Sequence, residues 1–559
     1  MPNGKLVLDY VYEHEESHPD KILLTQPLPG GKVVHYPWHA VLDEARRMAA
    51  HLQRSGLDHG AHIAILSKNC AHFIIAELAI WMAGGTTVAI FPTEHVDTIR
   101  FVLEHSDAKL LFVGKLDNWD EQRSGVPAGM PCIALPLAPP TEFDRWEDVV
   151  GRTPALKGRP ARAGDDLAML IYTSGSTGQP KGVMHAFGRI TRAVEGIIQA
   201  NLKPLDADEE IRMLSYLPLA HVYERSGLQC LSLIRGNAHV YFSESLETFV
   251  SDLNRARPTV FYSVPRLWLN FQRGIFAKVP RAKLDVLLAI PFLRKMVGRK
   301  ILRGLGLDCV RLAGSASAPI PAALIAWYRR LGLNLVEGYG MTEDFGYSHV
   351  SRDGFNAPGY VGVPYEGVEV RLSEEGEILI KSPGQFVGYY KRPDLDAESF
   401  TPDGFFRTGD RGERRADGLL KITGRIKEIF KTAGGEYVAP APIENLLNEH
   451  PMVELSMVSG VGRASAYGMV VLSEPWRGKV DDPDAKSRVE AELVQLLDKV
   501  NRTVASRERL QMLVALREPW TVENGCLTPT MKIKRSRIEA LAEEKLDAWY
   551  SAGAQVIWT

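Results

Sequence analysis

The stretch Thr173-Ser-Gly-Ser-Thr-Gly-Gln-Pro-Lys-Gly182 holds three glycines, four hydroxyl residues and one lysine within ten positions. The apolar run at 167–172 precedes it and predicts a buried strand, so we expect the stretch to be a loop at that strand's carboxyl end. Glycine N–H groups, hydroxyl donors and an ammonium group favour polyphosphate binding. The spacing is not that of a Walker loop, because Gln179 and Pro180 precede Lys181. The ordered run before the stretch argues against the alternative, a flexible Ser/Gly linker.

Around this stretch, short apolar runs alternate with segments of helical periodicity, a pattern typical of β-α-β units and a parallel sheet. The expected strands are 63–66, 87–90 and 110–113, and the expected helices are 38–55, 71–83 and about 97–104. Further strands are expected within 213–221, 259–265, 309–313 and 334–340. These later strands end in small or polar residues, and open α/β sheets collect their ligand groups at such strand ends. We therefore expect a shared site there.

From about residue 366 the pattern changes to period 2, which predicts antiparallel strands. The segments 367–372 and 377–381 form an expected hairpin, and 404–410 and 419–425 continue the antiparallel region. We predict an α/β protein with two domains. Residues 1–426 form a large N-terminal domain of parallel and mixed sheets with helices plus a β-rich subdomain. Residues 427–559 form a small, mobile α+β domain with a charged helix at 536–549.

Composition excludes several classes of protein. The chain has 559 residues, 45% hydrophobic and 24% charged, with a formal net charge of -2, which argues against a general nucleic-acid binder. Its five cysteines have no C-x-x-C spacing and no histidine cluster, which disfavours a zinc site or a disulfide framework and suits a reducing cytosol. The N-terminus does not read as a signal peptide, and no run reaches the roughly 18 apolar residues of a membrane span. We expect a cytoplasmic protein.

A short apolar segment at 284–293 contains Asp285 and Pro291. Basic residues flank it on both sides: Arg281, Lys283, Arg294, Lys295, Arg299, Lys300 and Arg303. Two interpretations stay open. A basic amphipathic segment lies on an anionic membrane surface, giving a peripherally associated enzyme, or it is an ordinary helix with a solvated basic face.

Five motifs occur in an order that resembles one known family: Tyr172-Thr-Ser-Gly-Ser-Thr-Gly-Gln-Pro-Lys-Gly182, Tyr339-Gly-Met-Thr-Glu343, Thr408-Gly-Asp410, Gly424-Arg425 and Leu527-Thr-Pro-Thr-Met-Lys532. The chain resembles the adenylate-forming superfamily of acyl-CoA synthetases, luciferases and peptide-synthetase adenylation domains. Two stretches, 217–225 and 527–535, most resemble long-chain fatty acyl-CoA synthetases. The resemblance implies that a carboxylate attacks the α-phosphate of ATP to give acyl-AMP, and that the thiol of coenzyme A then displaces AMP. It implies ATP, Mg²⁺ and CoA.

The resemblance assigns a first group of residues to the phosphates of ATP. The pyrophosphate would be held by Thr173, Ser174, Gly175, Ser176, Thr177, Gly178 and Lys181. Thr342 would donate to the α-phosphate, and Glu343 would be a hard oxygen ligand for Mg²⁺. The structural alternatives are a helix N-cap for Thr342 and a partner of the helix dipole for Glu343.

The resemblance assigns a second group to the nucleoside. Adenine would stack on Tyr339, near the backbone of Ser317, Ala318, Glu337 and Gly338. Asp410 would accept from the ribose hydroxyls, and Arg425 would support the sugar or phosphate. The alternative for Asp410 is a turn former.

Lys532 is the residue predicted to neutralise charge in adenylation. The alternative is a solvated basic patch with Lys534, Arg535 and Arg537. His221 matches a family position near the carboxylate and thiol, although a lone histidine is commonly structural. Lys427 lies at the expected hinge, and the expected path of the pantetheine thiol passes Gly434 and Gly435.

The 217–225 turn lacks the aspartate that amino-acid-activating members use, and its apolar surroundings favour a medium- or long-chain acyl group. An alternative acceptor is the phosphopantetheine of a carrier protein. A nucleotide sensor without catalysis is disfavoured by Lys532, Glu343 and Asp410. Nothing in the sequence favours luciferase-like oxidation or indicates an oligomeric state.

Overall fold

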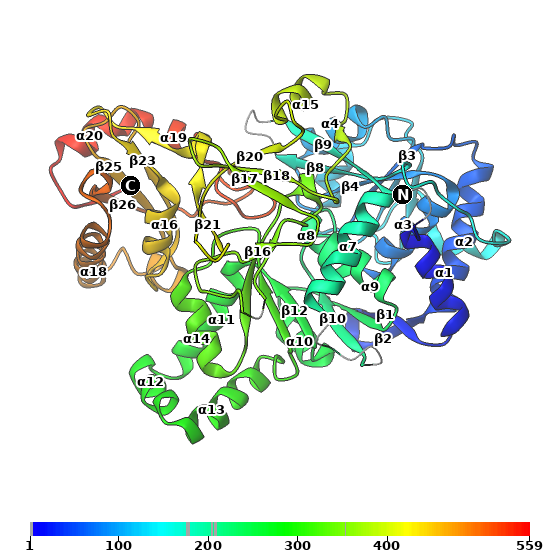
Figure 1. The fold of residues 1–559 in the computed structure, drawn as a ribbon, viewed down its shortest axis with the longest axis horizontal. Helices are drawn as coiled ribbons and strands as arrows, with labels where there is room; N and C mark the ends of the chain where they lie inside the picture. The colour runs from blue at the N-terminus through cyan, green and yellow to red at the C-terminus, as the bar shows by residue number, and fades with distance from the viewer. Residues whose placement is uncertain (1–3, 175–178, 203–204, 206–208, 353) are drawn as a thin grey trace. The chain divides into compact units, whose positions relative to one another are not determined.

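A computed structural model describes residues 4–174, 179–202, 205, 209–352 and 354–559. The chain divides into two compact units (Figure 1). The first comprises Met1–Ala318, Leu324–Glu369 and Ile380–Phe406, and the second comprises Pro319–Ala323, Val370–Leu379 and Arg407–Thr559. The predicted domain boundary between residues 426 and 427 stays a prediction.

The largest sheet of the first unit confirms the predicted strands at 63–66, 87–90 and 110–113. Among the described residues its strand order is β19-β9-β8-β4-β3-β5-β6-β7. The bounds are β19 Gly388–Tyr389, β9 Pro180–Ala186, β8 Leu167–Ser174, β4 Thr86–Ile90, β3 His62–Leu66, β5 Leu110–Val113, β6 Cys132–Ala134 and β7 Asp144–Arg145. The strands from β8 to β7 are parallel, whereas β9 and β19 run antiparallel to their neighbours. The apolar strands are buried because helices cover them.

The glycine-rich stretch connects two strands of one hairpin. β8 continues to Ser174, two residues beyond the predicted strand, and β9 begins at Pro180. Antiparallel pairing of Thr173 with Lys181 and of Ser174 with Pro180 extends the ladder up to the connection. The sequence did not predict β9, because its residues alternate only weakly between apolar and polar.

Two further sheets belong to the first unit. One has the order β12-β13-β14-β15-β16, with β12 Val260–Ser263, β13 Leu312–Ser315, β14 Leu335–Tyr339, β15 His349–Val350 and β16 Val363–Pro364. The other has the order β10-β11-β1-β2, with β10 Ile211–Ser215, β11 Ala238–Phe242, β1 Ile22–Pro27 and β2 Val33–Pro37. The strand predicted at 309–313 begins only at Leu312, because Val310 donates its N–H to the Leu307 carbonyl in a turn.

The main helices of the first unit are α1 Val7–Ser17, α2 Trp38–Arg54, α3 Ala71–Ala83, α4 Val96–His105, α7 Phe187–Asn201, α11 Pro265–Lys278, α12 Arg281–Ala289, α13 Pro291–Gly304 and α14 Ala322–Leu331. The helices predicted at 38–55, 71–83 and 97–104 are therefore confirmed as α2, α3 and α4. Helices α12 and α13 pack against each other and project away from the sheets of this unit (Figure 1). Within the described part of the chain, no helix is long and apolar enough to cross a membrane.

The second unit contains an antiparallel sheet, a mixed sheet and helices. The predicted hairpin is β17 Glu369–Leu372 and β18 Glu377–Lys381, which continues into β20 Phe406–Arg414 and β21 Leu420–Arg425. A separate sheet has the order β24-β25-β26-β27, with β24 Val453–Ser459, β25 Ala466–Leu472, β26 Leu510–Leu516 and β27 Val556–Trp558.

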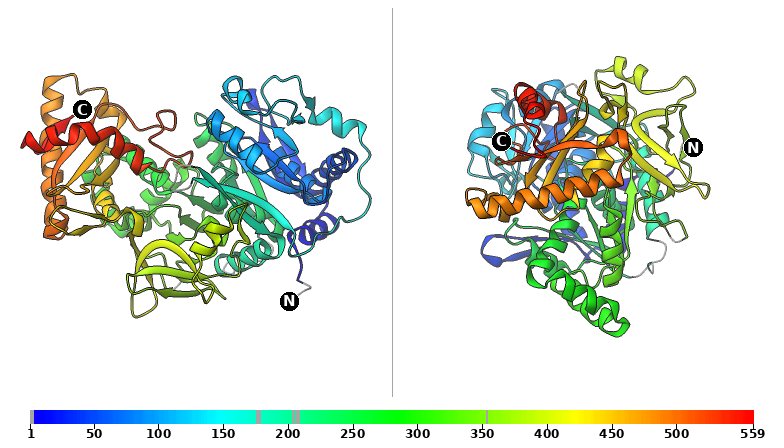
Figure 2. Two further views of the ribbon diagram at one scale, coloured as in Figure 1. Left: turned by 90° about the horizontal axis from the view of Figure 1, so that it is seen from above. Right: turned by 90° about the vertical axis from the view of Figure 1, so that its left-hand side faces the viewer.

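The helices of the second unit include α16 Pro440–Asn448 and α18 Pro483–Thr503, which lies along that separate sheet (Figure 2). The single helix predicted at 536–549 is two helices, α19 Arg535–Ala542 and α20 Leu546–Ser551. A 3-10 turn at Glu543–Lys545 separates them.

Candidate active site

The phosphate-binding stretch contributes Lys181 at the start of β9, directly opposite Thr173 of β8. The residues Gly175, Ser176, Thr177 and Gly178 lie outside the described residues. The ammonium of Lys181 lies 5.0 Å from the ring centre of Tyr389, within cation–π range. Since β19 pairs with β9 at Tyr389 and Val183, the register of the sheet fixes this contact.

Tyr389 also connects Lys181 to Glu343. Its hydroxyl donates to Glu343 Oε1 at 2.7 Å, and the Glu343 carbonyl accepts from the N–H of Phe386 at 2.7 Å. Burial, together with the neighbouring carboxylate, raises the pKa of Tyr389, so the hydroxyl remains a donor. A carboxylate oriented in this way is a hard oxygen ligand that suits Mg²⁺, and the ammonium of Lys181 suits phosphate. No sequence motif identified Tyr389, because only the pairing of β19 with β9 brings it to this position.

Thr342 begins a 3-10 turn, Thr342–Asp344, whose geometry depends on Asp344. The Asp344 carboxylate accepts from the N–H groups of Met341 at 2.9 Å and Gly346 at 2.8 Å. Burial raises the pKa of Asp344 to about 7. A Cβ at Gly340 would lie 2.7 Å from the backbone of Gly346, so only glycine permits this close approach. Thr342 is the first residue of the turn rather than its N-cap, which is Met341.

The predicted adenine-binding residues lie at the ends of two neighbouring parallel strands. Ser315, the last residue of β13, is paired with Glu337 of β14, and Gly338 and Tyr339 complete β14. Ser317 and Ala318 follow β13, and Ser317 has φ 72°, a left-handed conformation that is uncommon for a non-glycine residue. Such local strain is concentrated at functional sites. The two strand ends thus bring the predicted group together.

His221 has a structural role in the described geometry. It caps helix α8, Val222–Glu224, and its Nδ1 accepts from the N–H of Tyr223 at 3.2 Å. This bond assigns the ring proton to Nε2 in the neutral tautomer. The capping bond leaves a second role at Nε2 compatible with the geometry.

Two other residues of the 217–225 motif stabilise the fold. Glu224 accepts from Ser215 Oγ at 2.8 Å and from the N–H of Tyr216 at 3.1 Å, and its burial raises its pKa to about 8. Arg225 forms a fully buried ion pair with Glu77 of α3. The motif therefore fixes the chain around His221 through buried polar contacts.

In the second unit, Asp410 and Arg425 are cross-strand partners in β20 and β21, with Arg425 Nε 3.0 Å from Asp410 Oδ1. Asp410 therefore lies in a strand, which excludes the alternative of a hairpin-turn former. Thr408 Oγ1 accepts from the Asp410 N–H at 3.0 Å and donates to the Ile378 carbonyl at 2.7 Å. Thr408 thus fixes the backbone of Asp410, and Arg425 pairs with its buried carboxylate.

The predicted hinge residue and the two predicted glycines of the pantetheine path are exposed in the second unit. Lys427 belongs to a 3-10 turn, Ile426–Glu428, directly after β21. Gly434 and Gly435 form the turn between β22 Phe430–Lys431 and β23 Tyr437–Val438, and Gly435 has φ 84°.

Lys532 is exposed in a tight loop, where the N–H of Thr528 donates to its carbonyl at 2.8 Å. The alternative of a solvated patch of four basic residues is wrong for one member. Arg535 is largely buried and pairs with Glu444 at 2.7 Å.

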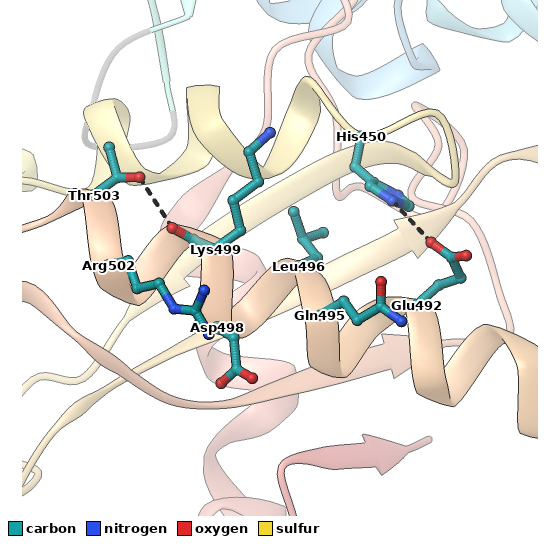
Figure 3. A pocket seen from close by; sticks show the side chains of 8 residues that line it. All are labelled: His450, Glu492, Gln495, Leu496, Asp498, Lys499, Arg502 and Thr503. Carbon is teal, nitrogen blue, oxygen red and sulfur yellow. Dashed lines mark hydrogen bonds and ion pairs between the residues drawn. The ribbon is translucent and has the colours of Figure 1, made fainter.

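A hollow on α18 contains none of the predicted residues (Figure 3). Its lining residues are His450, Glu492, Gln495, Leu496, Asp498, Lys499, Arg502 and Thr503. His450 Nε2 lies 3.6 Å from Glu492 Oε2, and the Thr503 hydroxyl donates to the Lys499 carbonyl at 3.0 Å, as in an ordinary helix. The mixed charges indicate no particular ligand.

Comparison with known protein families identifies the class of protein. Residues 11–390 match the AMP-binding enzyme family, and residues 428–554 match the AMP-binding enzyme C-terminal domain. The chain therefore belongs to the AMP-binding family of adenylate-forming enzymes. A long-chain-fatty-acid–CoA ligase of Mycobacterium bovis, FadD15, is 31% identical, covering 97% of this chain and 96% of the relative. The peroxisomal long chain acyl-CoA synthetase 7 of Arabidopsis thaliana is 28% identical, covering 98% of this chain and 86% of the relative.

Solved structures agree in fold. The adenylation and carrier-protein didomain of a carboxylic acid reductase from Segniliparus rugosus, in complex with AMP, has a TM-score of 0.82 at 24% identity, covering 98% of this chain and 82% of that one. The anthranilate CoA ligase AuaEII, in complex with anthranoyl-AMP, has a TM-score of 0.77 at 22% identity, covering 98% of this chain and 99% of that one. Within its family, the protein is an AMP-forming acid–thiol ligase, which activates a carboxylic acid with ATP and uses Mg²⁺ and CoA.

Proposed function

We propose that this ligase activates a medium- or long-chain fatty acid and transfers the acyl group to CoA. The observation that carries the proposal is the similarity over nearly the whole length of both chains to a protein named a long-chain-fatty-acid–CoA ligase. The apolar side chains beside His221 agree with an acyl substrate, although Leu228, Leu231 and Leu233 are also part of the hydrophobic core.

Residues of the first unit would bind the polyphosphate. A carboxylate and ATP are both anions, so their approach requires fixed positive charge and oriented donors. Lys181 would neutralise the departing pyrophosphate, together with the backbone and hydroxyl groups of the glycine-rich stretch. Thr342 would donate to the α-phosphate, and Glu343, oriented by Tyr389, would hold Mg²⁺. When bound, Mg²⁺ would supply positive charge to the phosphates.

Residues of the second unit would complete the site. Asp410 would accept hydrogen bonds from the ribose hydroxyls, since Thr408 fixes its backbone N–H and Arg425 pairs with its carboxylate. Lys532 would stabilise the charge that develops between the substrate carboxylate and the α-phosphate. The small domain, residues 427–559, would then change its orientation about Lys427 and present Gly434 and Gly435 to the pantetheine.

Pyrophosphate exchange into ATP tests the proposed substrate. Fatty acids of increasing chain length, benzoate and amino acids are compared, and the fastest exchange is expected with medium- or long-chain fatty acids. The acyl acceptor is then tested with CoA and with a phosphopantetheinylated carrier protein. Faster exchange with amino acids or benzoate contradicts the acyl proposal. Faster transfer to the carrier protein supports the alternative, an acyl-AMP ligase that serves a carrier.

Substitution of Tyr389 tests the proposed Mg²⁺ site. Tyr389→Phe removes the hydroxyl that orients Glu343, and a hydrogen bond to a charged group contributes about 1.5–3 kcal/mol. We expect the Mg²⁺ concentration for half-maximal pyrophosphate exchange to rise about tenfold, the change equivalent to about 1.4 kcal/mol. Tyr390→Phe is the matched control, because its hydroxyl contacts Asp107 instead. An equal shift in both variants would contradict the assignment.

Substitution of Asp410 tests the ribose contact. Asp410→Asn keeps the shape of the side chain and removes the charge that pairs with Arg425. We expect the KM for ATP to rise by about tenfold, an effect of about 1.4 kcal/mol, while the KM for the fatty acid changes little. Asp417→Asn is the control, because that carboxylate pairs with Arg415 at the turn of the same hairpin. If the KM values for ATP and for the fatty acid rise equally in Asp410→Asn, the substitution has damaged the site in general and the ribose assignment is contradicted.

The cytoplasmic location and a peripheral membrane contact are part of this proposal. A soluble ligase whose substrate partitions into lipid would meet that substrate at a membrane surface. A carrier protein as acceptor stays the alternative partner.

A further inference from the structure

Helices α12 and α13 and the residue that joins them carry a group of exposed apolar side chains, which we call the tip patch: Val286, Ile290, Phe292 and Met296. Phe292 is 79% exposed and Val286 is 65% exposed. Other exposed large apolar side chains of the described residues are scattered along the chain, singly or as one close pair, Leu246 and Val250. Soluble proteins rarely expose such a cluster without a binding partner.

The geometry of the helices keeps the tip patch at the surface. Phe292 and Met296 are four residues apart in α13, so they lie on one helical face. Val286 lies in α12, and Ile290 is the extended residue between the two helices. The other side of α13 is fixed against the end of α14. A Cβ at Gly298 would lie 2.3 Å from the Leu331 carbonyl oxygen, and Leu302, one turn further along, is also buried. Helix α13 therefore cannot turn Phe292 and Met296 inward without losing this contact.

Basic side chains surround the tip patch. Lys295 and Arg299 lie on the same face of α13 as Phe292 and Met296, and Lys283, Arg294, Lys300 and Arg303 are exposed nearby. Among the described residues, none of these six forms an ion pair. The one acidic residue of the pair of helices, Asp285, is paired with Arg330 at 3.0 Å. The surface of the two helices therefore combines apolar side chains with unpaired positive charge.

We propose that the tip patch and its basic residues bind the surface of an anionic lipid membrane. A solvated basic face, the other interpretation of this segment, does not explain why Phe292 and Met296 are exposed among the basic residues. An acidic protein surface would match the charge alone, whereas a bilayer interface accepts both apolar side chains and basic residues. This inference rests on the proposed function, because a membrane-bound ligase would receive fatty acids directly from the bilayer.

Vesicle flotation with the purified full-length chain tests the inference. Vesicles of phosphatidylcholine alone are compared with vesicles that also contain phosphatidylglycerol, without fatty acid, ATP or CoA. We expect binding only to the anionic vesicles, and release at high salt because surface charges are then screened. Equal binding to neutral vesicles, or no binding at all, would overturn the proposal.

Two double variants separate the apolar and the charged contributions. Phe292→Ser with Met296→Ser is expected to lower the partition coefficient at least about tenfold, from lost apolar burial. Lys295→Gln with Arg299→Gln is expected to lower it about thirtyfold, at about 1 kcal/mol for each basic residue. The controls are Leu246→Ser, at an apolar residue that is more exposed than Phe292 and Met296, and Arg54→Gln with Lys157→Gln, at two other exposed basic residues. Unchanged binding of either tip variant, or equal losses in the controls, would overturn the proposal.

Further measurements separate this inference from the proposed function. The melting temperature and the activation of a water-soluble short-chain acid should be unchanged in the tip variants, because no tip residue belongs to the active site. If fatty acids are activated but vesicles are not bound, only the membrane inference is wrong. If the anionic vesicles are bound but fatty acids are not activated, only the acyl proposal is wrong. Self-association that the Phe292→Ser, Met296→Ser variant loses, without vesicle binding, would identify a second copy as the partner and overturn the inference.

Discussion

Replacing Lys532 with alanine is expected to lower the rate of acyl-AMP formation by about 10²–10³-fold, the usual loss on removing one donor that stabilises transition-state charge. Lys532 is exposed in a loop held by two hydrogen bonds to Thr528. Both involve the Lys532 backbone, so truncation of the side chain leaves the loop intact. The substitution therefore removes a charge with little effect on the fold. Pyrophosphate exchange measures this half-reaction.

The second half-reaction provides the decisive comparison. Thioester formation from supplied acyl-AMP and CoA should change little, because no carboxylate attacks the α-phosphate in that step. Lys534→Ala is the matched control, because Lys534 is a neighbouring exposed lysine two residues beyond the core motif that ends at Lys532. Equal losses in both half-reactions of Lys532→Ala, or an equal loss of exchange in Lys534→Ala, would refute the specific role of Lys532.

Periodicity predicted much of the fold because several elements of the first unit are apolar and buried along most of their length. The strands at 63–66, 87–90 and 110–113 and the helix at 71–83 are buried along most of their length, so their residue types are dictated by burial. The predictions failed where pairing with distant residues decides the structure. Residues Pro180–Ala186 form β9 because β8 and β19 pair with them, which no local pattern records.

In the candidate site, too, local sequence patterns predicted some residues, whereas residues positioned by distant contacts were not predicted. The motifs located Lys181, Glu343 and Asp410, because short stretches with fixed spacing carry that information. Tyr389 was missed, since it contacts Glu343 from a strand 46 residues further along the chain. Asp344 was also missed as the residue that organises the turn at Thr342, because its function depends on burial and on the positive φ values at Phe345 and Gly346.

Replacing Lys427 with proline is expected to preserve acyl-AMP formation and to lower thioester formation by about 10²-fold. A proline in an incompatible backbone conformation costs about 3 kcal/mol or more, which corresponds to a change of about 10²-fold in rate. The turn at Ile426–Glu428 is closed by bonds from the Ile429 N–H to the carbonyls of Arg425 at 3.2 Å and Ile426 at 3.3 Å, and proline at 427 removes neither donor. A hinge, in contrast, must change φ and ψ, and proline fixes φ.

The control is Lys427→Ala, which removes the side chain but leaves the backbone free to rotate. Proline also disfavours the α region for Ile426, so the melting temperatures of both variants must be compared with that of the original chain. If Lys427→Ala retains thioester formation and Lys427→Pro does not, the backbone at 427 is the hinge. Equal losses in both variants would assign the effect to the lysine side chain. Unchanged thioester synthesis in Lys427→Pro would show that the second half-reaction needs no rotation at this residue.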